Sequence, residues 1–319
     1  MQVLAFDPAD HREQYAREGW VHIPSGIDPD FLAELSAFVS GRFESHHVAG
    51  RGIGGTKEQA VYEFPPAVDF PGHLFDVIAA VAGLKRASVT LSERHIKAYD
   101  ADAPADPPAH KDRLSSQVSV GLSIDIPHGS QLVLYPYANR ETNPFNVSAA
   151  LRETLPEPEL PENVLAGAPE VVIEDKPGDV MLFEGSAMWH KRRQAAGAVN
   201  LYLKFNDFGS DPLGEDPATD ALRSATRAAL SSGAVAELVA TPARQLDTIS
   251  RQITRDPGRE ILQADVWGSK PLALSEADAA LLRELDGGRR VADVLGAGSV
   301  TEQDVRRLAE HGVIDLVAR

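Results

Sequence analysis

The sequence contains no cysteine. A chain without thiols has no disulfides, no thiol nucleophile, and no thiolate ligands for zinc fingers or iron–sulfur clusters. It also has no uninterrupted apolar run approaching the roughly 20 residues of a membrane-spanning helix. The N-terminal segment MQVLAFDPADHREQYAREG lacks the basic start and the apolar stretch of a signal peptide. We therefore expect a soluble, cytoplasmic protein.

Positive charge is scarce as well. Lys and Arg number 31 against 47 Asp and Glu, which gives a formal net charge of −16. Such a balance disfavours binding through general phosphate contacts with nucleic acid and disfavours anchoring to anionic membranes. We expect a small-molecule substrate, with neither a nucleic acid nor a membrane as partner. Hydrophobic residues make up 43% of the chain, which supports a packed core.

The 319 residues exceed what one compact core usually needs, so we expect a main domain over 1–210 and an accessory domain over 211–319. Helical patterns near the start precede a β-rich middle. In QVSVGLSIDIP, apolar and polar residues alternate, which is typical of a strand with one buried face. Residues 44–72 contain many glycines and predict a long loop. Further short strands are predicted in QLVLYP, PEVVIED, DVMLFEG and NLYLKFND, so the pattern favours an α+β fold with a sandwich or barrel core.

The tail follows the linker SDPLGEDPATD and has a helical pattern. Ser275 and Thr301 are each followed three residues later by an aspartate, which is a helix-start signal, and Gly287 and Gly312 mark helix ends. These features predict a small helical, winged-helix-like domain. Its acidic residues outnumber its basic ones, whereas a winged helix that reads DNA normally has a basic face. We therefore expect an interaction role, such as formation of a homodimer.

The segment PPAHKDRLSSQVSVG places a histidine and an aspartate two positions apart, directly before the alternating strand. Residues i and i+2 of a strand point to the same side, so His110 and Asp112 can converge on one ion. A mononuclear non-haem iron site needs a second imidazole. The best candidate is His190, just past the predicted strand in PGDVMLFEGSAMWH. The alternative is a solvated turn, which the bare His-x-Asp pattern favours and its strand context disfavours.

Several segments together resemble the Fe(II)- and 2-oxoglutarate-dependent dioxygenases, and among them the phytanoyl-CoA hydroxylase-like group. They are YAREGWVHIPSGIDPDFLAELSAFV, HIKAYD, AHKD, GSQLVLYP and KPGDVMLFEGSAMWH, and they span residues 14–208. The resemblance implies a double-stranded β-helix, or jelly roll, with His110, Asp112 and His190 as iron ligands. It also implies that 2-oxoglutarate chelates the iron and that O2 is the oxidant.

The chain departs from the family pattern at the residue that pairs with the distal carboxylate of 2-oxoglutarate. The family usually has an arginine about ten residues after the second histidine, where this chain has Asn200 or Leu201. Lys204 is the closest substitute, because it shares strand parity with Asn200. Lys97, in HIKAYD, is a further candidate. Arg192 and Arg193 are expected to lie too close to His190 to reach the cosubstrate.

The retained Asp112 favours hydroxylation or a related oxidation, because related halogenases carry a small residue at that place. The resemblance thus implies oxidation of an unactivated C–H bond in a small molecule such as an amino acid or a natural-product intermediate. The segments 100–109 and 44–62 are expected to close over such a substrate. Two alternatives remain open: a non-catalytic jelly-roll binding or regulatory protein, and a hydroxylase of protein side chains.

Overall fold

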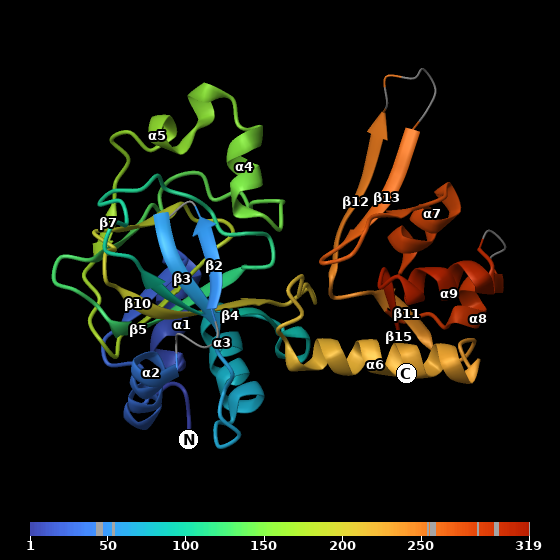
Figure 1. Ribbon diagram of the computed structural model, residues 1–319, viewed down its shortest axis with the longest axis horizontal. Helices are drawn as coiled ribbons and strands as arrows, with labels where there is room; N and C mark the ends of the chain where they lie inside the picture. Colours follow the sequence, from blue (N-terminus) through green and yellow to red (C-terminus); the bar gives the residue numbers. More distant parts are fainter. Residues whose placement is uncertain are drawn as a thin grey trace. The chain divides into compact units, whose positions relative to one another are not determined.

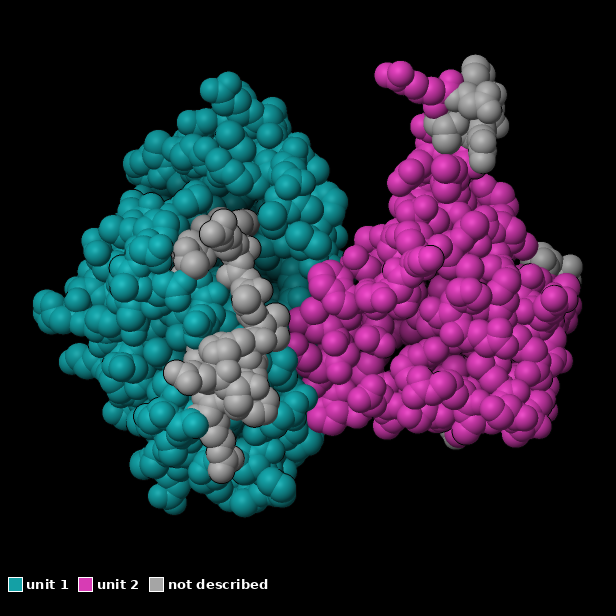
Figure 2. All heavy atoms as spheres, viewed as in Figure 1, with its two compact units in different colours: residues 1–208 teal, residues 209–319 magenta. Residues whose placement is uncertain are grey.

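The computed structural model describes residues 1–42, 47–52, 55–253, 255, 260–285, 287–296 and 300–318. The chain divides into two compact units, Met1–Phe208 and Gly209–Arg319 (Figure 2). Of the helices in the described ranges, none combines the length and the apolar character needed to traverse a lipid bilayer.

Two antiparallel sheets form the first unit (Figure 1). The larger has seven strands and the smaller has three. In spatial order the larger contains β1 (Trp20–Ile23), β8 (Val180–Phe183), β5 (Val118–Asp125), β10 (Val199–Asn206), β4 (Thr90–Tyr99), β3 (Gly55–Val61) and β2 (His47–Gly52). The smaller contains β7 (Val171–Ile173), β6 (Gln131–Leu134) and β9 (His190–Arg193). From β5 onward the chain passes back and forth between the two sheets.

Helices cover the outer face of the larger sheet. They are α1 (Ala9–Glu18), α2 (Pro29–Arg42), the π-helical turn η2 (Phe70–Leu74), α3 (Phe75–Ala82) and the short 3-10 helix η3 (Arg86–Ser88). Apolar side chains of these helices form one core with alternate residues of the sheet, such as Val120 on β5 and Leu203 on β10. The insertion between β6 and β7 carries α4 (Ser148–Thr154), the 3-10 turn η4 (Glu157–Glu159) and α5 (Pro161–Val164).

The polar face of β5 is buried as well as its apolar face, which corrects the expectation of a single buried face. Val118, Val120 and Leu122 pack against the helices, while Ser119 and Ser123 point toward the smaller sheet and are fully buried. Burying hydroxyl groups costs free energy unless they are hydrogen-bonded. Buried serines on an alternating strand therefore mark the inner face as a polar site and not as a plain core.

The prediction of a long loop over residues 44–72 is wrong in its central part. β2 and β3 pair as an antiparallel hairpin, and β3 also pairs with β4, so that Lys57 lies opposite Tyr99. Lys57 of β3 lines the polar cavity between the two sheets, which accounts for a charged residue on this strand. Residues 44–46 and 53–54, part of the segment expected to close over a substrate, lie outside the described residues.

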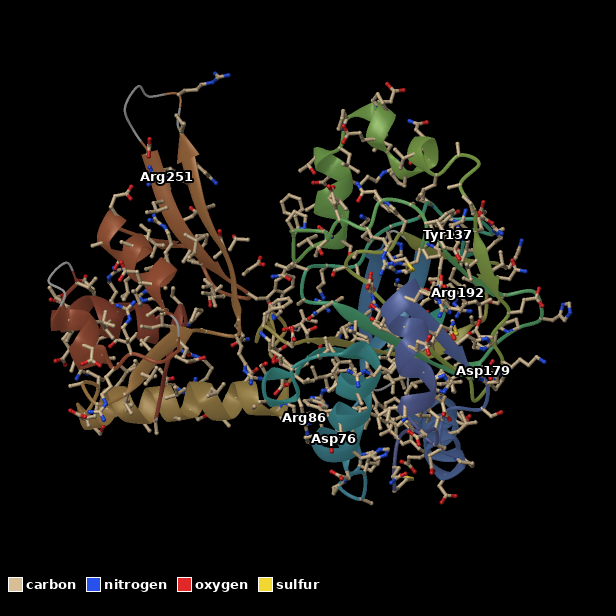
Figure 3. All side chains as sticks on the ribbon, turned by 180° about the vertical axis from the view of Figure 1, so that it is seen from behind. Asp76, Arg86, Tyr137, Asp179, Arg192 and Arg251 are labelled. Atoms are coloured by element: carbon tan, nitrogen blue, oxygen red, sulfur yellow. The ribbon has the colours of Figure 1, made fainter. Side chains whose placement is uncertain are left out.

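The second unit is less helical than the sequence predicts. Its helices are α6 (Pro217–Ser232), α7 (Glu276–Glu284), α8 (Val291–Gly296) and α9 (Glu302–Glu310). Its strands are β11 (Val239–Pro242), β12 (Leu246–Ile253), β13 (Glu260–Val266), β14 (Leu272–Ala273) and β15 (Ile314–Val317). The expected capping boxes at Ser275 and Thr301 are both present. Most of β12 is exposed or half-buried, so it shows no apolar alternation, and Arg251 on it pairs with Glu260 (Figure 3). The winged-helix likeness stays a prediction.

Candidate metal centre

His110 and His190 face each other across a β-bridge. The backbone N–H of each donates to the carbonyl oxygen of the other at 2.9 Å, and their ring centroids lie 4.4 Å apart. Asp112 follows two residues after His110 and lies on the same side of the chain. One donor atom from each of the three side chains lies within 4.8 Å of the others, so the group could hold a metal ion. The structure thus brings together the three residues that the sequence singles out.

Both imidazoles are buried, and that of His190 is oriented to act as a ligand through Nε2. The Nδ1–H of His190 donates to the carbonyl oxygen of Met188 at 2.9 Å, which leaves Nε2 with a free lone pair. Burial lowers the pKa of His190, and it lowers the pKa of His110 well below its usual value. Neutral imidazole is the form that binds a metal. Two neutral imidazoles and a carboxylate on one face are the donor set of a non-haem iron site.

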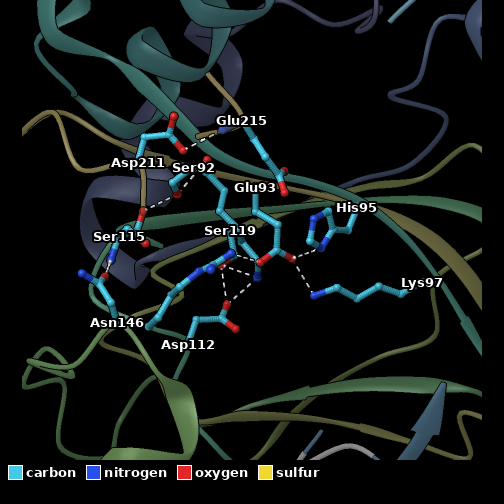
Figure 4. Close-up of polar contacts among 12 residues, drawn as sticks. Ser92, Glu93, His95, Lys97, Asp112, Ser115, Ser119, Asn146, Asp211 and Glu215 are labelled. Carbon is cyan, nitrogen blue, oxygen red and sulfur yellow. Dashed lines mark hydrogen bonds and ion pairs between the residues drawn. The ribbon is translucent and has the colours of Figure 1, made fainter. Parts of the chain in front are cut away.

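Asp112 is held as a carboxylate by its neighbours. Its N–H donates to the carbonyl oxygen of Gly185 at 2.9 Å. Its Oδ2 accepts hydrogen bonds from Lys204 Nζ at 2.5 Å and from Ser119 Oγ at 2.6 Å (Figure 4). Although burial opposes the charge, the ammonium of Lys204 and the two histidines keep the pKa of Asp112 well below its usual value.

Gly185 makes this close contact sterically possible. A Cβ atom at position 185 would lie 1.9 Å from Ser119 Oγ and 2.7 Å from Asp112 Oδ2. Real Cβ atoms essentially never approach another heavy atom below 3.0 Å. Only a glycine therefore fits beside the paired Asp112 and Ser119 without displacing one of them.

Lys204 lies on the inner face of β10, as its strand parity predicts, but its ammonium is already engaged. It also donates to Ser119 Oγ at 2.9 Å, and its side chain is 4% exposed. The ring centroids of Tyr202 and Phe183 lie 5.3 Å and 5.9 Å from Nζ. Contact with the carboxylate of Asp112 thus places Lys204 next to the metal centre.

Lys97 lines the same cavity and is paired with a buried glutamate. Its Nζ lies 2.6 Å from Glu93 Oε1, and the guanidinium of Arg113 contacts the other carboxylate oxygen of Glu93. Burial opposes ionisation of both partners, yet their mutual attraction raises the pKa of Lys97 and holds the pKa of Glu93 well below its usual value. The contact of Glu93 with Arg113 ties β4 to the chain segment next to Asp112.

The expectation that Arg192 lies too close to His190 to reach the cosubstrate stays a prediction. Arg192 lies two residues after His190 on the same face of β9, and its side chain lines the cavity that contains the metal-binding group. Its guanidinium makes two hydrogen bonds to Asp175, at 3.0 Å and 2.9 Å. Asn200 is buried nearby, and its amide donates to Ser123 Oγ at 3.4 Å, but it is not among the residues that line the cavity.

The cavity is strongly cationic and is lined by residues of both sheets. Its wall includes Lys57, Lys97, Lys191, Arg192 and Lys204, with Asp112 as the carboxylate. Four of these cations have carboxylate partners, and Lys57 has none among the described residues. The Nζ of Lys57 lies 5.5 Å from the ring centroid of Tyr99. Burial and the nearby charge of Lys97 lower the pKa of Lys57 to about 8.

The segment over residues 100–109 reaches the cavity through Pro107. Asp106 pairs with Lys191 at 2.6 Å and with Arg193 at 3.3 Å, and the N–H of Gln194 donates to the carbonyl oxygen of Ala105 at 2.7 Å. These contacts fasten the segment to β9 and place it at the edge of the site.

Sequence reasoning missed Lys57, Ser119 and Gly185, and it considered Arg192 but set it aside. The roles of Lys57 and Ser119 depend on the register of β3 on β4 and of β5 on β10, which pairs Ser119 with Lys204. One signal was available for Arg192, since it shares strand parity with His190. Nothing in the sequence around Lys57 distinguishes it from an exposed lysine.

No protein-family model matches this chain, and no curated protein matches it. Solved structures with a similar fold include the non-heme alpha ketoglutarate dependent carbocyclase SnoK from nogalamycin biosynthesis. The identity is 14%, the TM-score is 0.49, and the match covers 62% of this chain and 83% of SnoK. A prolyl-4-hydroxylase from Pseudomonas putida is 17% identical with a TM-score of 0.44, over 63% of this chain and 98% of the other. HygX from Streptomyces hygroscopicus, with nickel and 2-oxoglutarate bound, is 13% identical with a TM-score of 0.45, over 65% and 89%. Likenesses at this level do not assign a function to the chain.

Proposed function

We propose that this protein is an Fe(II)- and 2-oxoglutarate-dependent oxygenase of the phytanoyl-CoA hydroxylase-like group that oxidises a C–H bond of a small molecule. The observation that carries the proposal is the convergence of His110, Asp112 and His190 within 4.8 Å at the wall of a cationic cavity. Two imidazoles and one carboxylate leave coordination positions open for a cosubstrate and O2. The identical donor set in a solvated turn would not be buried between two sheets.

The sheet connections support a double-stranded β-helix. β4, β10, β5 and β8 are neighbours in the larger sheet, while β9, β6 and β7 form the smaller one, and the His110 segment adds to β9. From β5 to β10 the chain crosses between the two sheets four times, with β6 and β7 consecutive in the smaller one, and such crossing supports the connectivity of a jelly roll. The two histidines fall on the smaller sheet, and the side chains that hold Asp112 fall on the larger.

Iron would be held by His110, Asp112 and His190, and together with 2-oxoglutarate it would supply the oxidising power for C–H cleavage. The protein's own groups do the remaining work. Met188 fixes the tautomer of His190, while Lys204 and Ser119 fix the orientation of Asp112. The two sheets and the segment around Pro107 surround the site and restrict access of water.

Lys57 is the residue best placed to bind the distal carboxylate of 2-oxoglutarate. It is a half-buried cation in the cavity wall without a carboxylate partner among the described residues, so a bound anion would supply the missing partner. Lys97 and Lys204 remain candidates, but each would have to share its ammonium with a carboxylate that it already contacts. Asn200 lies in the adjoining interior, and its side-chain amide would donate a hydrogen bond to the same carboxylate of 2-oxoglutarate.

We propose that the reaction is the hydroxylation of an amino acid or a natural-product intermediate. We also propose that the protein forms a homodimer through its second unit. The cavity favours a small molecule, because it is lined by residues of both sheets. A non-catalytic binding protein would retain the cavity without iron-dependent turnover of 2-oxoglutarate, and a protein hydroxylase would act on a peptide.

An anaerobic titration tests the proposal. The apo-protein is titrated with Fe(II) and then with 2-oxoglutarate, and the weak visible charge-transfer absorption of the chelate is recorded. We expect absorption in the wild type and none in Asp112→Ala, while the matched control Asp102→Ala, at an exposed aspartate, behaves as the wild type. Lys57→Met should retain iron but need about tenfold more 2-oxoglutarate, the size expected for losing one charge-assisted contact. Absence of iron binding in the wild type refutes the oxygenase proposal.

A further inference from the structure

We propose that Lys204 is a positioning and charge-balancing residue of the metal centre: it confines Asp112 to coordination through Oδ1 and lowers the affinity of the empty site for a divalent ion. This inference rests on the proposed metal site at His110, Asp112 and His190. It assigns Lys204 a task different from that of a cosubstrate anchor.

The first part follows from the hydrogen bonds of Asp112. Its Oδ2 accepts from both Lys204 Nζ and Ser119 Oγ, at 2.5 Å and 2.6 Å. Lys204 and Ser119 also contact each other at 2.9 Å, so the three groups form a closed triangle. Oδ2 also lies 3.7 Å from His190 Nε2, but its two donors already occupy it. The Oδ1 atom lies 3.9 Å from His110 Nε2 and accepts from neither Lys204 nor Ser119. An ion held by both histidines would therefore meet Oδ1 as the available oxygen.

The second part follows from charge. Two neutral histidines and one carboxylate give a site of charge −1, and the ammonium of Lys204 brings that charge to zero. A bound divalent ion then keeps its full charge of two within the site, which favours an anionic co-ligand such as an oxo acid. Groups that hydrogen-bond a metal ligand usually strengthen metal binding, and their removal typically weakens it about 10- to 100-fold. A cation in that place acts in the opposite direction, because it repels the metal ion.

The position of Lys204 is fixed by the fold. In the larger sheet the backbone of Lys204 lies opposite Glu93 of β4 on one side and opposite Ser119 of β5 on the other. The backbone carbonyl of Lys204 accepts a hydrogen bond from Ser92 Oγ at 3.3 Å, and the side chain is enclosed by the rings of Tyr202 and Phe183. A side chain that is 4% exposed has no solvent into which it could withdraw when the metal binds.

Anaerobic titration with Co(II) tests the inference, with the visible d–d absorption as the readout. Four full-length proteins are compared: wild type, Lys204→Met, Lys204→Arg and Ser119→Ala. We expect Lys204→Met to bind Co(II) about tenfold more tightly than the wild type in the absence of 2-oxoglutarate. Lys204→Arg retains the charge and should stay within about threefold of the wild type. Ser119→Ala removes a donor without removing charge, so it should bind Co(II) no more tightly than the wild type.

A second titration in saturating 2-oxoglutarate examines the charge balance. The gain in Co(II) affinity on adding 2-oxoglutarate should be larger in the wild type than in Lys204→Met. Co(II) binding that is unchanged or weaker in Lys204→Met overturns the inference, whereas a wild type that binds no Co(II) overturns the proposed function itself. Circular dichroism checks folding, and Lys204→Gln replaces Lys204→Met if the methionine variant is unfolded.

Discussion

Replacing Gly185 by alanine should damage the metal centre without removing any ligand. The added Cβ would lie 1.9 Å from Ser119 Oγ, so the hydroxyl would have to retreat by about 1.5 Å to reach ordinary contact in a close-packed interior. The carbonyl oxygen of Ser116, 2.9 Å from the Cβ, limits relaxation on the other side. Ser119 would then lose its short contact with Asp112.

The expected cost has two parts. Overpacking a buried site costs about 1–3 kcal/mol, which lowers the Tm of a unit of this size by roughly 3–9 °C. Loss of the hydrogen bond that orients Asp112 should weaken Co(II) binding about 10- to 100-fold. Differential scanning calorimetry and the Co(II) titration measure the two effects separately.

Gly41→Ala is the matched control, because Gly41 lies in α2 and, among the described residues outside its own stretch of helix, no atom lies within 4 Å of the Cβ it would gain. It should leave Co(II) binding unchanged and stabilise the fold by up to about 1 kcal/mol. A Gly185→Ala protein with the Tm and the Co(II) affinity of the wild type would refute the claim that a glycine is required beside Asp112.

Two further outcomes are expected. Glu93→Gln should destabilise the first unit by about 3 kcal/mol, because it leaves two buried cations without their partner. Since the folded pKa of Glu93 lies below its usual value, its ion pairs stabilise the fold above about pH 4 and lose that contribution as the pH falls further. The difference in urea midpoint between the two proteins should therefore shrink in acid, and a constant difference would count against the ion pairs. Asp315→Asn breaks a buried pair with Arg223 in the second unit, so it should lower stability while leaving Co(II) affinity unchanged. A change in Co(II) affinity would contradict the expectation that the metal site is independent of this ion pair.

The convergence of the three candidate metal-binding residues could be predicted because their signals are local. His110 and Asp112 lie two apart beside an alternating strand, and His190 follows a strand and a turn. Short-range patterns of this kind can be recognised in a single sequence. The expectation of an α+β fold rested on the same strands and agrees with the mixed architecture and the antiparallel sheets.

The rest of the site depends on which strands become neighbours. Lys204 was expected to reach the cosubstrate, but its contact with Asp112 follows from the pairing of β10 with β5, which no local pattern encodes. The β2–β3 hairpin and the β12–β13 hairpin were missed for a related reason. Their strands lack a continuous apolar face, because one borders a polar cavity and the other is largely exposed.

The closed triangle of Asp112, Ser119 and Lys204 also has a consequence for how the protein folds. Asp112 belongs to the chain segment that joins the smaller sheet, whereas Ser119 and Lys204 belong to the larger one. Contacts between residues far apart in sequence form late, because the entropy of closing the intervening chain must be overcome first. A chain that ends before β10 already contains His110, Asp112 and His190, but its Asp112 lacks the ammonium of Lys204. The charge of Asp112 is therefore balanced only when β10 pairs with β5, late in folding.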